Sequence, residues 1–332
     1  MAVTFGKPIV CPVIVGRDWH LAALRRCVDD VRAGAGQVLL VPGEAGVGKS
    51  RLVGELRTLC QREGWLVLEG GCFEHARSLP YGPLLDLLRG YAVARTPEEL
   101  TASLGSSARD VAALLPELAS RLPAMPPEPP LGPEQAKRHR FDALAQVFVD
   151  LAARAPLLVV VEDLHWADVA SVEFLAWLAP RLPSRPILLA LTYRGDEIGS
   201  APRHLLAQLD RARVASELPL EPLSAAEVAD MLSATFQLVR PVRADFLTAL
   251  YGLTEGNPFF VEESLKSLVM AGEIFYEDGR WDRKAVDELH IPRSVQDAVR
   301  RRSKHLSATG RDLLAVAAVA GQRFAFALLA DV

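Results

Sequence analysis

The residues Gly43-Glu44-Ala45-Gly46-Val47-Gly48-Lys49-Ser50 follow the apolar run Val38-Leu39-Leu40-Val41. This order predicts a buried strand, a glycine-rich turn and a helix that begins near Lys49. Glycines let the backbone N–H groups of such a turn curl around an anion, and the new helix points its unsatisfied N–H groups at the same place. The eight residues therefore predict a phosphate-binding loop, in which Lys49 reaches the β- and γ-phosphates of ATP and the Ser50 hydroxyl coordinates Mg²⁺.

The composition is that of an ordinary globular protein. The chain has 332 residues, of which 50% are hydrophobic and 23% charged, and its formal net charge is −4. This length suffices for two or three domains, and the charge argues against a surface that binds DNA over the whole chain. The four cysteines, at positions 11, 27, 60 and 72, lack the spacing of a metal site. No apolar run reaches about 18 residues, so we expect a cytoplasmic protein with no membrane partner.

Two adjacent acids follow a second apolar run. Residues 157–161 read Leu-Leu-Val-Val-Val, and Glu162 and Asp163 come directly after them. One acid at the end of a buried strand can hold the hydration shell of Mg²⁺, while another orients or deprotonates the attacking water. We therefore assign both acids, together with Lys49, to catalysis of ATP hydrolysis to ADP. Because adjacent strand residues point in opposite directions, the alternation leaves open which of the two acids faces the metal.

Helical segments separate the apolar runs, and this alternation predicts a doubly wound parallel sheet of the P-loop α/β class. A third run, residues 187–193, ends at Arg194. Ligands of such sheets bind at the carboxyl ends of the strands, where the loop, the two acids and Arg194 all lie. Arg194 could sense the γ-phosphate or form a surface ion pair, and the pattern does not decide between these roles. We expect the nearby His165 to be a hydrogen-bonded structural residue rather than a catalyst.

Three domains are predicted along the chain. The core spans residues 1–222, with a proline-rich connection at 123–133. A helical lid at 223–272 opens with the capping box formed by Ser224 and Glu227. Residues 273–332 combine a hairpin around Asp278-Gly279 with helices at 294–306 and 308–319, which suggests a winged-helix-like domain that the end of the chain truncates. The basic residues 300–304 are more typical of a solvated helix face than of a DNA contact.

In this order, the motifs resemble the STAND class of signal-transducing P-loop ATPases, and in particular the N-terminal ATPase module of large ATP-binding LuxR-type transcriptional regulators. The resemblance covers nearly the whole chain. Its residues are the phosphate loop, Val15-Gly16-Arg17-Asp18, Leu79-Pro80-Tyr81-Gly82-Pro83, Glu162-Asp163-Leu164-His165-Trp166-Ala167-Asp168, Thr192-Tyr193-Arg194 and Gly256-Asn257-Pro258-Phe259-Phe260-Val261-Glu262-Glu263.

This resemblance implies a nucleotide-dependent switch. ATP would bind between the core and the lid, ADP would favour a closed resting form, and exchange would allow opening and self-association. By position, Gly16 and Arg17 would lie near the adenine, Pro258 would pack on the base, and Arg194 would sense the γ-phosphate. Glu162 stands where many P-loop ATPases have the Asp that binds Mg²⁺, which leaves its division of labour with Asp163 open. DNA binding would belong to a C-terminal domain beyond Val332.

Other functions fit parts of the pattern. Similar ATPase modules accompany adenylyl cyclase or protein kinase domains, although Met1 lies so close to residues 15–17 that a native start there would leave no room for an upstream catalytic domain. A mechanical AAA+ ATPase would need an arginine finger, and no residue here can be assigned that role. A vestigial site is disfavoured by the intact Lys49, Ser50 and paired acids. The leading expectation is a slowly hydrolysing ATPase switch in a signal-responsive transcriptional regulator.

Overall fold

The chain forms two compact units. The computed structural model describes residues 9–122, 131–277, 280–283 and 307–320. One unit is Gly16–Glu221, and the other combines Met1–Val15 with Pro222–Val332. The first unit holds the phosphate loop and the paired acids, so it carries most of the predicted site.

A five-stranded sheet forms the centre of the first unit. Its strand order is β2-β3-β4-β1-β5, and every neighbouring pair is parallel. The apolar runs of the sequence become the buried strands, because side chains that alternate between the two faces of a covered sheet must be apolar on both. This arrangement confirms the predicted doubly wound α/β fold. The strands are β1 (Gln37–Pro42), β2 (Leu66–Gly71), β3 (Leu157–Glu162), β4 (Ile187–Tyr193) and β5 (Ala215–Glu217).

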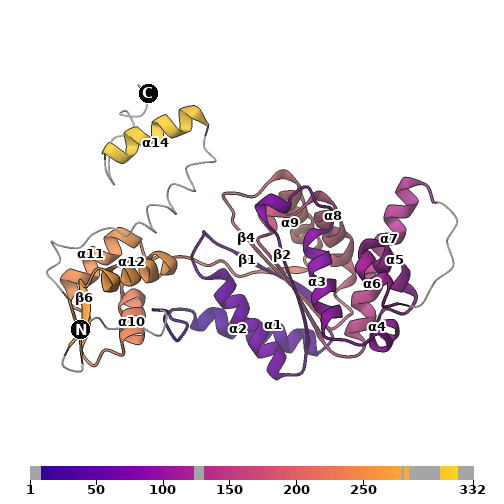
Figure 1. The fold of residues 1–332 in the computed structure, drawn as a ribbon, viewed down its shortest axis with the longest axis horizontal. Helices are drawn as coiled ribbons and strands as arrows, with labels where there is room; N and C mark the ends of the chain where they lie inside the picture. Colours follow the sequence, from indigo (N-terminus) through magenta and orange to yellow (C-terminus); the bar gives the residue numbers. More distant parts are fainter. Residues whose placement is uncertain (1–8, 123–130, 278–279, 284–306, 321–332) are drawn as a thin grey trace. The chain divides into compact units, whose positions relative to one another are not determined.

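Helices cover both faces of this sheet (Figure 1). On one face lie α1 (Asp18–Arg32) and α2 (Lys49–Arg62), and on the other lie α3 (Gly82–Val93), α8 (Val169–Leu178) and α9 (Ser200–Ala212). The long helix α7 (Pro133–Ala152) packs beside α8 and β3. The shorter helices α4 (Pro97–Leu104), α5 (Ala108–Leu114) and α6 (Pro116–Ala119) extend the same apolar core toward α7. Single helical turns lie at Glu74–Ala76 (η1), Gly105–Ser107 (η2), Leu164–Trp166 (η3) and Ala179–Arg181 (η4).

The second unit is built on three helices, α10 (Ala225–Phe236), α11 (Ala244–Thr254) and α12 (Pro258–Met270), whose apolar faces share one core. The predicted capping box is confirmed, since the Ser224 hydroxyl accepts from the Glu227 N–H and the Glu227 carboxylate accepts from the Ser224 N–H. Cys11 is buried in this core, and its N–H donates to Glu262 Oε1 over 3.1 Å. The segment before the first helix therefore packs with α10 to α12.

The hairpin predicted after the lid is confirmed as β6 (Ile274–Glu277) paired with β7 (Arg280–Arg283). Helix α14 (Ala308–Ala320) follows Ser307, whose hydroxyl accepts from the Gly310 N–H over 3.0 Å. The proline-rich residues 123–130, the turn at 278–279 and the predicted helix 294–306, with its basic residues, lie outside the described residues. The winged-helix-like domain therefore stays a prediction. No helix within the described ranges is long and apolar enough to cross a bilayer.

Gly256 joins the starts of α10 and α12 in the second unit. Its φ is +74°, and a Cβ at this position would lie 1.8 Å from the Leu223 carbonyl oxygen. The Leu223 N–H also donates to the Gly256 carbonyl over 2.8 Å. Only glycine fits this close backbone approach without displacing one of the two segments.

We expect Gly256→Ala to destabilise this unit by about 2 to 4 kcal/mol, because the new methyl group must push the backbone apart. Hydrogen exchange of α10 and α12, followed by mass spectrometry, measures the loss of local stability. Gly252→Ala is the matched control: it lies inside α11, and an added Cβ would have no atom within 4 Å apart from its chain neighbours and the backbone of its own helix. We expect this change to be neutral or stabilising by up to about 1 kcal/mol. Equal protection in the two variants would contradict this explanation of Gly256.

Candidate nucleotide-binding site

The loop between β1 and α2 has the backbone that its glycines predict. Gly46 and Gly48 have φ values of +82° and +106°, a region that favours glycine. At Gly43 the constraint is steric, because a Cβ would lie 2.8 Å from Val47 Cγ1 and 2.9 Å from the Leu220 carbonyl oxygen. The loop is therefore held in one conformation by both its own torsions and its neighbours.

Lys49 is buried at the start of α2, and its ammonium group lies inside the loop. Nζ donates to the carbonyl oxygens of Gly43 and Glu44 over 2.9 and 2.8 Å. Burial lowers the pKa of Lys49, and the nearby Asp163 carboxylate opposes that shift. The loop thus concentrates a positive charge at the point where helix α2 presents its free N–H groups, which suits a phosphate.

The structure distinguishes the two adjacent acids. The Ser50 hydroxyl donates to Glu162 Oε2, so Glu162 faces the loop serine. Asp163 instead has a left-handed backbone with φ +57°, and its N–H donates to Thr192 Oγ1 over 2.9 Å. Burial raises the pKa of Asp163, and the nearby Arg194 and Lys49 cations offset only part of this rise. Glu162 is therefore the acid beside Ser50, and Asp163 is the acid close to the two cations.

Thr192 is a site residue that sequence reasoning missed. It is fully buried near the carboxyl end of β4, where the neighbouring residues of the strand are apolar. A buried hydroxyl needs a hydrogen-bond partner, and the Thr192 hydroxyl accepts from the backbone N–H of Asp163. A single threonine in an otherwise apolar strand end was the only signal in the sequence.

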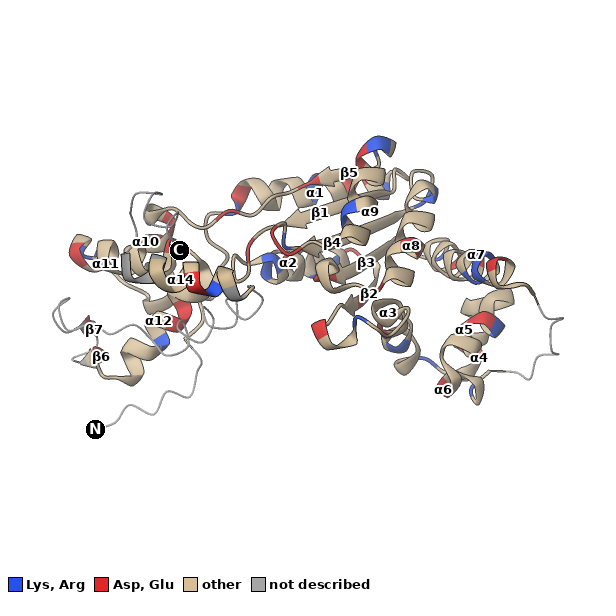
Figure 2. Cartoon of the chain, turned by 90° about the horizontal axis from the view of Figure 1, so that it is seen from above, with Lys and Arg blue, Asp and Glu red and all other residues tan. Residues whose placement is uncertain are grey.

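Arg194 follows β4 at the same edge of the sheet. The Gly43 N–H donates to the carbonyl oxygen of Tyr193 over 3.2 Å, so Arg194 leaves its strand beside the start of the phosphate loop. Its Nη1 donates to Glu197 Oε1 over 2.7 Å, and its guanidinium lies 4.9 Å from the centre of the Trp166 ring. Figure 2 shows both signs of charge at the start of α2, next to the end of β4. The ion pair that the sequence left open is present, and γ-phosphate sensing stays a prediction.

Arg17 lies against the phosphate loop. Its buried guanidinium donates through Nη2 to the carbonyl oxygens of Val47 and Glu221, over 3.4 and 2.6 Å. Gly16 precedes it with φ +67°. The structure thus brings Arg17 to the loop, and its predicted contact with adenine stays a prediction. Pro258 is the first residue of α12 in the other unit, so its predicted packing on the base also stays a prediction.

Asp168 connects two of the sequence motifs, residues 79–83 and residues 162–168. Its buried carboxylate accepts from the backbone N–H groups of Tyr81 and Gly82, over 2.9 and 3.2 Å. It also caps α8, accepting from the Ser171 N–H over 2.9 Å and from the Ser171 hydroxyl over 2.5 Å. One carboxylate therefore fixes the starts of α3 and α8. The spacing to Ser171 signals a helix cap, but nothing in the sequence links Asp168 to residues 81 and 82.

The expectation that His165 is hydrogen-bonded was wrong. Its side chain is fully buried, with Nδ1 3.9 Å from Asp163 Oδ1 and Nε2 3.8 Å from Glu197 Oε2. Within the described part of the chain, neither ring nitrogen has a hydrogen-bond partner. Burial, with Arg194 as the next cause, lowers the pKa of His165 to about 3. The imidazole is therefore neutral, because a buried cation next to Arg194 would be strongly unfavourable.

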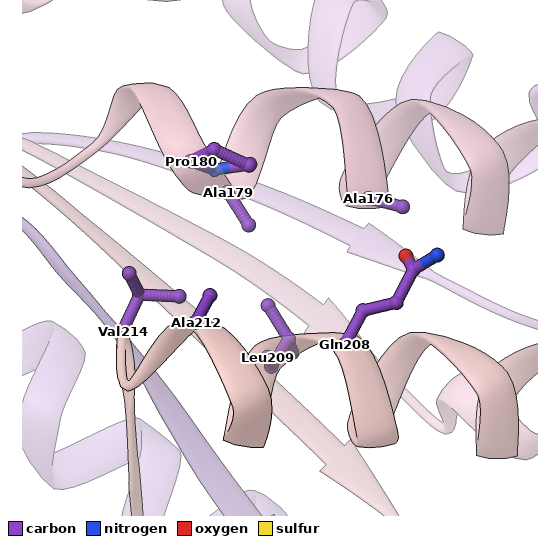
Figure 3. A pocket seen from close by; sticks show the side chains of 7 residues that line it. All are labelled: Ala176, Ala179, Pro180, Gln208, Leu209, Ala212 and Val214. Atoms are coloured by element: carbon purple, nitrogen blue, oxygen red, sulfur yellow. The ribbon is translucent and has the colours of Figure 1, made fainter.

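A groove of about 280 Å³ lies between the ends of α8 and α9, away from the phosphate loop. Figure 3 shows the small side chains of the two helices facing each other across it, with Gln208 as its polar member. Val214 of this groove directly precedes β5, so the groove lies at the amino ends of the parallel strands. It is therefore separate from the loop and the acids, which lie at the carboxyl ends.

Comparisons with known proteins fit this geometry. The AAA ATPase domain family matches residues 13–190, which is more than half of the chain. An uncharacterised protein of Rhizobium meliloti is 27% identical over 333 residues, covering 95% of this chain and 30% of that protein. The peroxide stress-activated histidine kinase mak3 of Schizosaccharomyces pombe is 28% identical over 214 residues, covering 60% of this chain and 9% of the kinase. The chain thus spans less than a third of the length of either relative.

Among solved structures, the chain is similar to a Signal Transduction ATPase with Numerous Domains (STAND) protein with a tetratricopeptide repeat sensor from Pyrococcus horikoshii. The TM-score is 0.44 and the sequence identity 16%, over 97% of this chain and 37% of that protein.

We expect Asp168→Ala to lower the free energy of unfolding by about 3 kcal/mol, because it leaves buried N–H groups at two helix starts without an acceptor. Urea unfolding measures the change. Glu173→Ala on the same helix is the control, since its exposed ion pair with Lys137 is worth at most about 1 kcal/mol. Equal losses in the two variants would show that Asp168 does not tie α3 to α8.

Proposed function

Because the chain belongs to the AAA ATPase domain family, we propose that it binds ATP with Mg²⁺ and hydrolyses it slowly, as the nucleotide switch of a larger signalling protein. The observation that carries this proposal is the contact between the Ser50 hydroxyl and Glu162, next to a loop that surrounds the buried Lys49 ammonium. A phosphate cradle and a paired hydroxyl and carboxylate are the parts that nucleotide hydrolysis needs at one place.

The residues beside the loop fit Mg²⁺. A hydroxyl and a carboxylate are oxygen ligands, which Mg²⁺ prefers, and it usually keeps several waters and takes only one or two carboxylates besides the phosphates. In keeping with this, no group of three or more His, Cys, Asp or Glu side chains among the described residues could cage a metal ion. Ser50 would coordinate the ion, with Glu162 holding its hydration shell and Asp163 nearby. Bound there, the ion would neutralise charge on the β- and γ-phosphates.

Each remaining residue has a role that its position supports. Lys49 would turn from the loop carbonyls to the β- and γ-phosphates. Asp163 would orient and deprotonate the attacking water, because burial raises the pKa of its carboxylate and so favours its accepting a proton. Arg194, which leaves β4 beside the loop, would bind the γ-phosphate. Arg17 and Gly16 would border the adenine, and Pro258 would pack on the base.

The biological role is the less direct part of the proposal. The resemblance to LuxR-type regulators supports a switch that controls transcription, with self-association in the ATP form. DNA would be contacted only through another domain of the whole protein.

Lys49→Ala tests the binding site directly. At 100 times the dissociation constant, Mg·ATP should stabilise the parent chain by about 2.7 kcal/mol, and we expect this stabilisation to vanish without the ammonium group. Thermal unfolding with and without Mg·ATP measures the difference. Lys137→Ala, which removes an exposed lysine of α7, should keep the full effect. If Lys49→Ala kept it too, the site assignment would fail.

The paired acids test hydrolysis. We expect the double variant Glu162→Gln, Asp163→Asn to keep nucleotide and lose turnover. Separately, Asp163→Asn should lower kcat about 100-fold or more at saturating Mg²⁺, because it removes the general base. Glu162→Gln should instead raise the Mg²⁺ concentration needed for half-maximal activity, because the Glu162 carboxylate faces Ser50, where the ion would bind. Phosphate release at varied Mg²⁺ measures both, and parental turnover in the double variant would remove the acids from the mechanism.

A further inference from the structure

The Arg194 guanidinium is already occupied by an acid of its own loop. Glu197 lies three residues further on, between β4 and α9, and its Oε1 accepts from Arg194 Nη1 over 2.7 Å. The two side chains are only 21% and 31% exposed, so solvent screens the pair less than it would on an open surface. The Nε atom of Arg194 is buried and makes no hydrogen bond to the described residues. Arg194 thus has spare donor capacity and one strong, negatively charged partner.

A carboxylate and a phosphate compete for the same guanidinium. Each offers two oxygen atoms to which the forked N–H groups can donate side by side, and both are anionic. Burial is the main cause that lowers the pKa of Lys49; the Arg194 cation lowers it further, and the Glu197 carboxylate opposes this. The ion pair therefore lies within reach of the charges of the phosphate loop.

Glu197 has a second partner close by. Its Oε2 lies 3.8 Å from His165 Nε2, which is about 1 Å too long for a hydrogen bond. The imidazole is fully buried with both nitrogens unpaired, an arrangement that normally costs stability. Moving Glu197 by this small distance would bring its carboxylate within hydrogen-bond reach of His165, and the carboxylate is freer to move once Oε1 no longer binds Arg194. Two arrangements of the Glu197 carboxylate are thus available, one paired with Arg194 and one shifted toward His165.

We propose that Glu197 sets the preference of the site between ATP and ADP, holding Arg194 in the ADP form and moving to His165 when the γ-phosphate takes Arg194. This inference rests on the proposed function, because it needs a γ-phosphate at the loop. ADP leaves the Arg194–Glu197 pair intact. A γ-phosphate that takes Arg194 Nη1 must break that pair, so Glu197 lowers the affinity for ATP and leaves the affinity for ADP unchanged.

Glu197→Gln tests this role, because it keeps the size of the side chain and removes its charge. We expect the dissociation constant of Mg·ATP to fall by about fivefold to tenfold, while that of Mg·ADP stays within about twofold. Titration calorimetry of the full chain with each nucleotide measures both. Asp196→Asn is the matched control, since Asp196 also acts on the Lys49 charge and no ion pair to it occurs among the described residues. It should change both affinities by the same factor.

Two further variants separate the partners of Glu197. In an Arg194→Ala background, Glu197→Gln should no longer change the ratio of the two affinities, because the pair that it breaks is gone. His165→Phe should weaken ATP binding about threefold relative to ADP, because the released carboxylate then loses its second donor. His165→Gln, which restores an N–H group, should recover part of that loss.

The outcomes distinguish this inference from the proposed function. If Glu197→Gln changes the ATP and ADP affinities equally, or if its effect persists without Arg194, the role of Glu197 is wrong while the ATPase proposal stands. If the parent chain binds neither nucleotide, both proposals fail together. A selective gain in ATP affinity that disappears with Arg194 would establish the competition.

Discussion

The site depends on the parallel pairing of β3, β4 and β1. The pairing sets Val161 opposite Leu191 and Pro42 opposite Tyr193, so three strands end at one level. Everything that follows these strands therefore meets at the same edge of the sheet. Because the strands are buried on both faces, a slip of one residue would turn every apolar side chain toward the wrong layer. The hydrophobic core thus fixes the positions of the charged groups, although it contains none of them.

Two cross-strand hydrogen bonds refine this arrangement. One joins the Gly43 N–H to the Tyr193 carbonyl, and the other joins the Asp163 N–H to the Thr192 hydroxyl. A left-handed backbone at a residue such as Asp163 costs about 1 kcal/mol or more, so it persists only where its surroundings favour it. The turn matters because it ends the alternation of the strand directly after Glu162. One acid then faces Ser50 and the other faces the cations, and two adjacent carboxylates acquire different environments.

The sequence predicted the parts of this structure that depend on local pattern. Apolar runs, the glycine spacing of the loop and the capping box at Ser224 each specify their own conformation within a few residues. The sequence could not show which of the two acids faces Ser50, because this depends on a left-handed turn at Asp163 that Thr192, 29 residues away, holds in place. Nor could it link Asp168 to the start of α3, 87 residues earlier. His165 was expected to be hydrogen-bonded, but the two acids near it lie in the loops that follow β3 and β4, and no sequence pattern encodes the exact distances between these loops.

The cations of the site are all paired with oxygen atoms of the chain itself. Lys49 donates to carbonyl oxygens of the loop, Arg17 to those of Val47 and Glu221, and Arg194 to the Glu197 carboxylate. A phosphate group that binds here must therefore replace existing hydrogen bonds, so its affinity is a difference between two sets of partners. Carbonyl oxygens are neutral and give way to phosphate readily, whereas a carboxylate competes with it as an anion. The residues that pair with the cations thus decide which phosphates the loop favours, as much as the cations do.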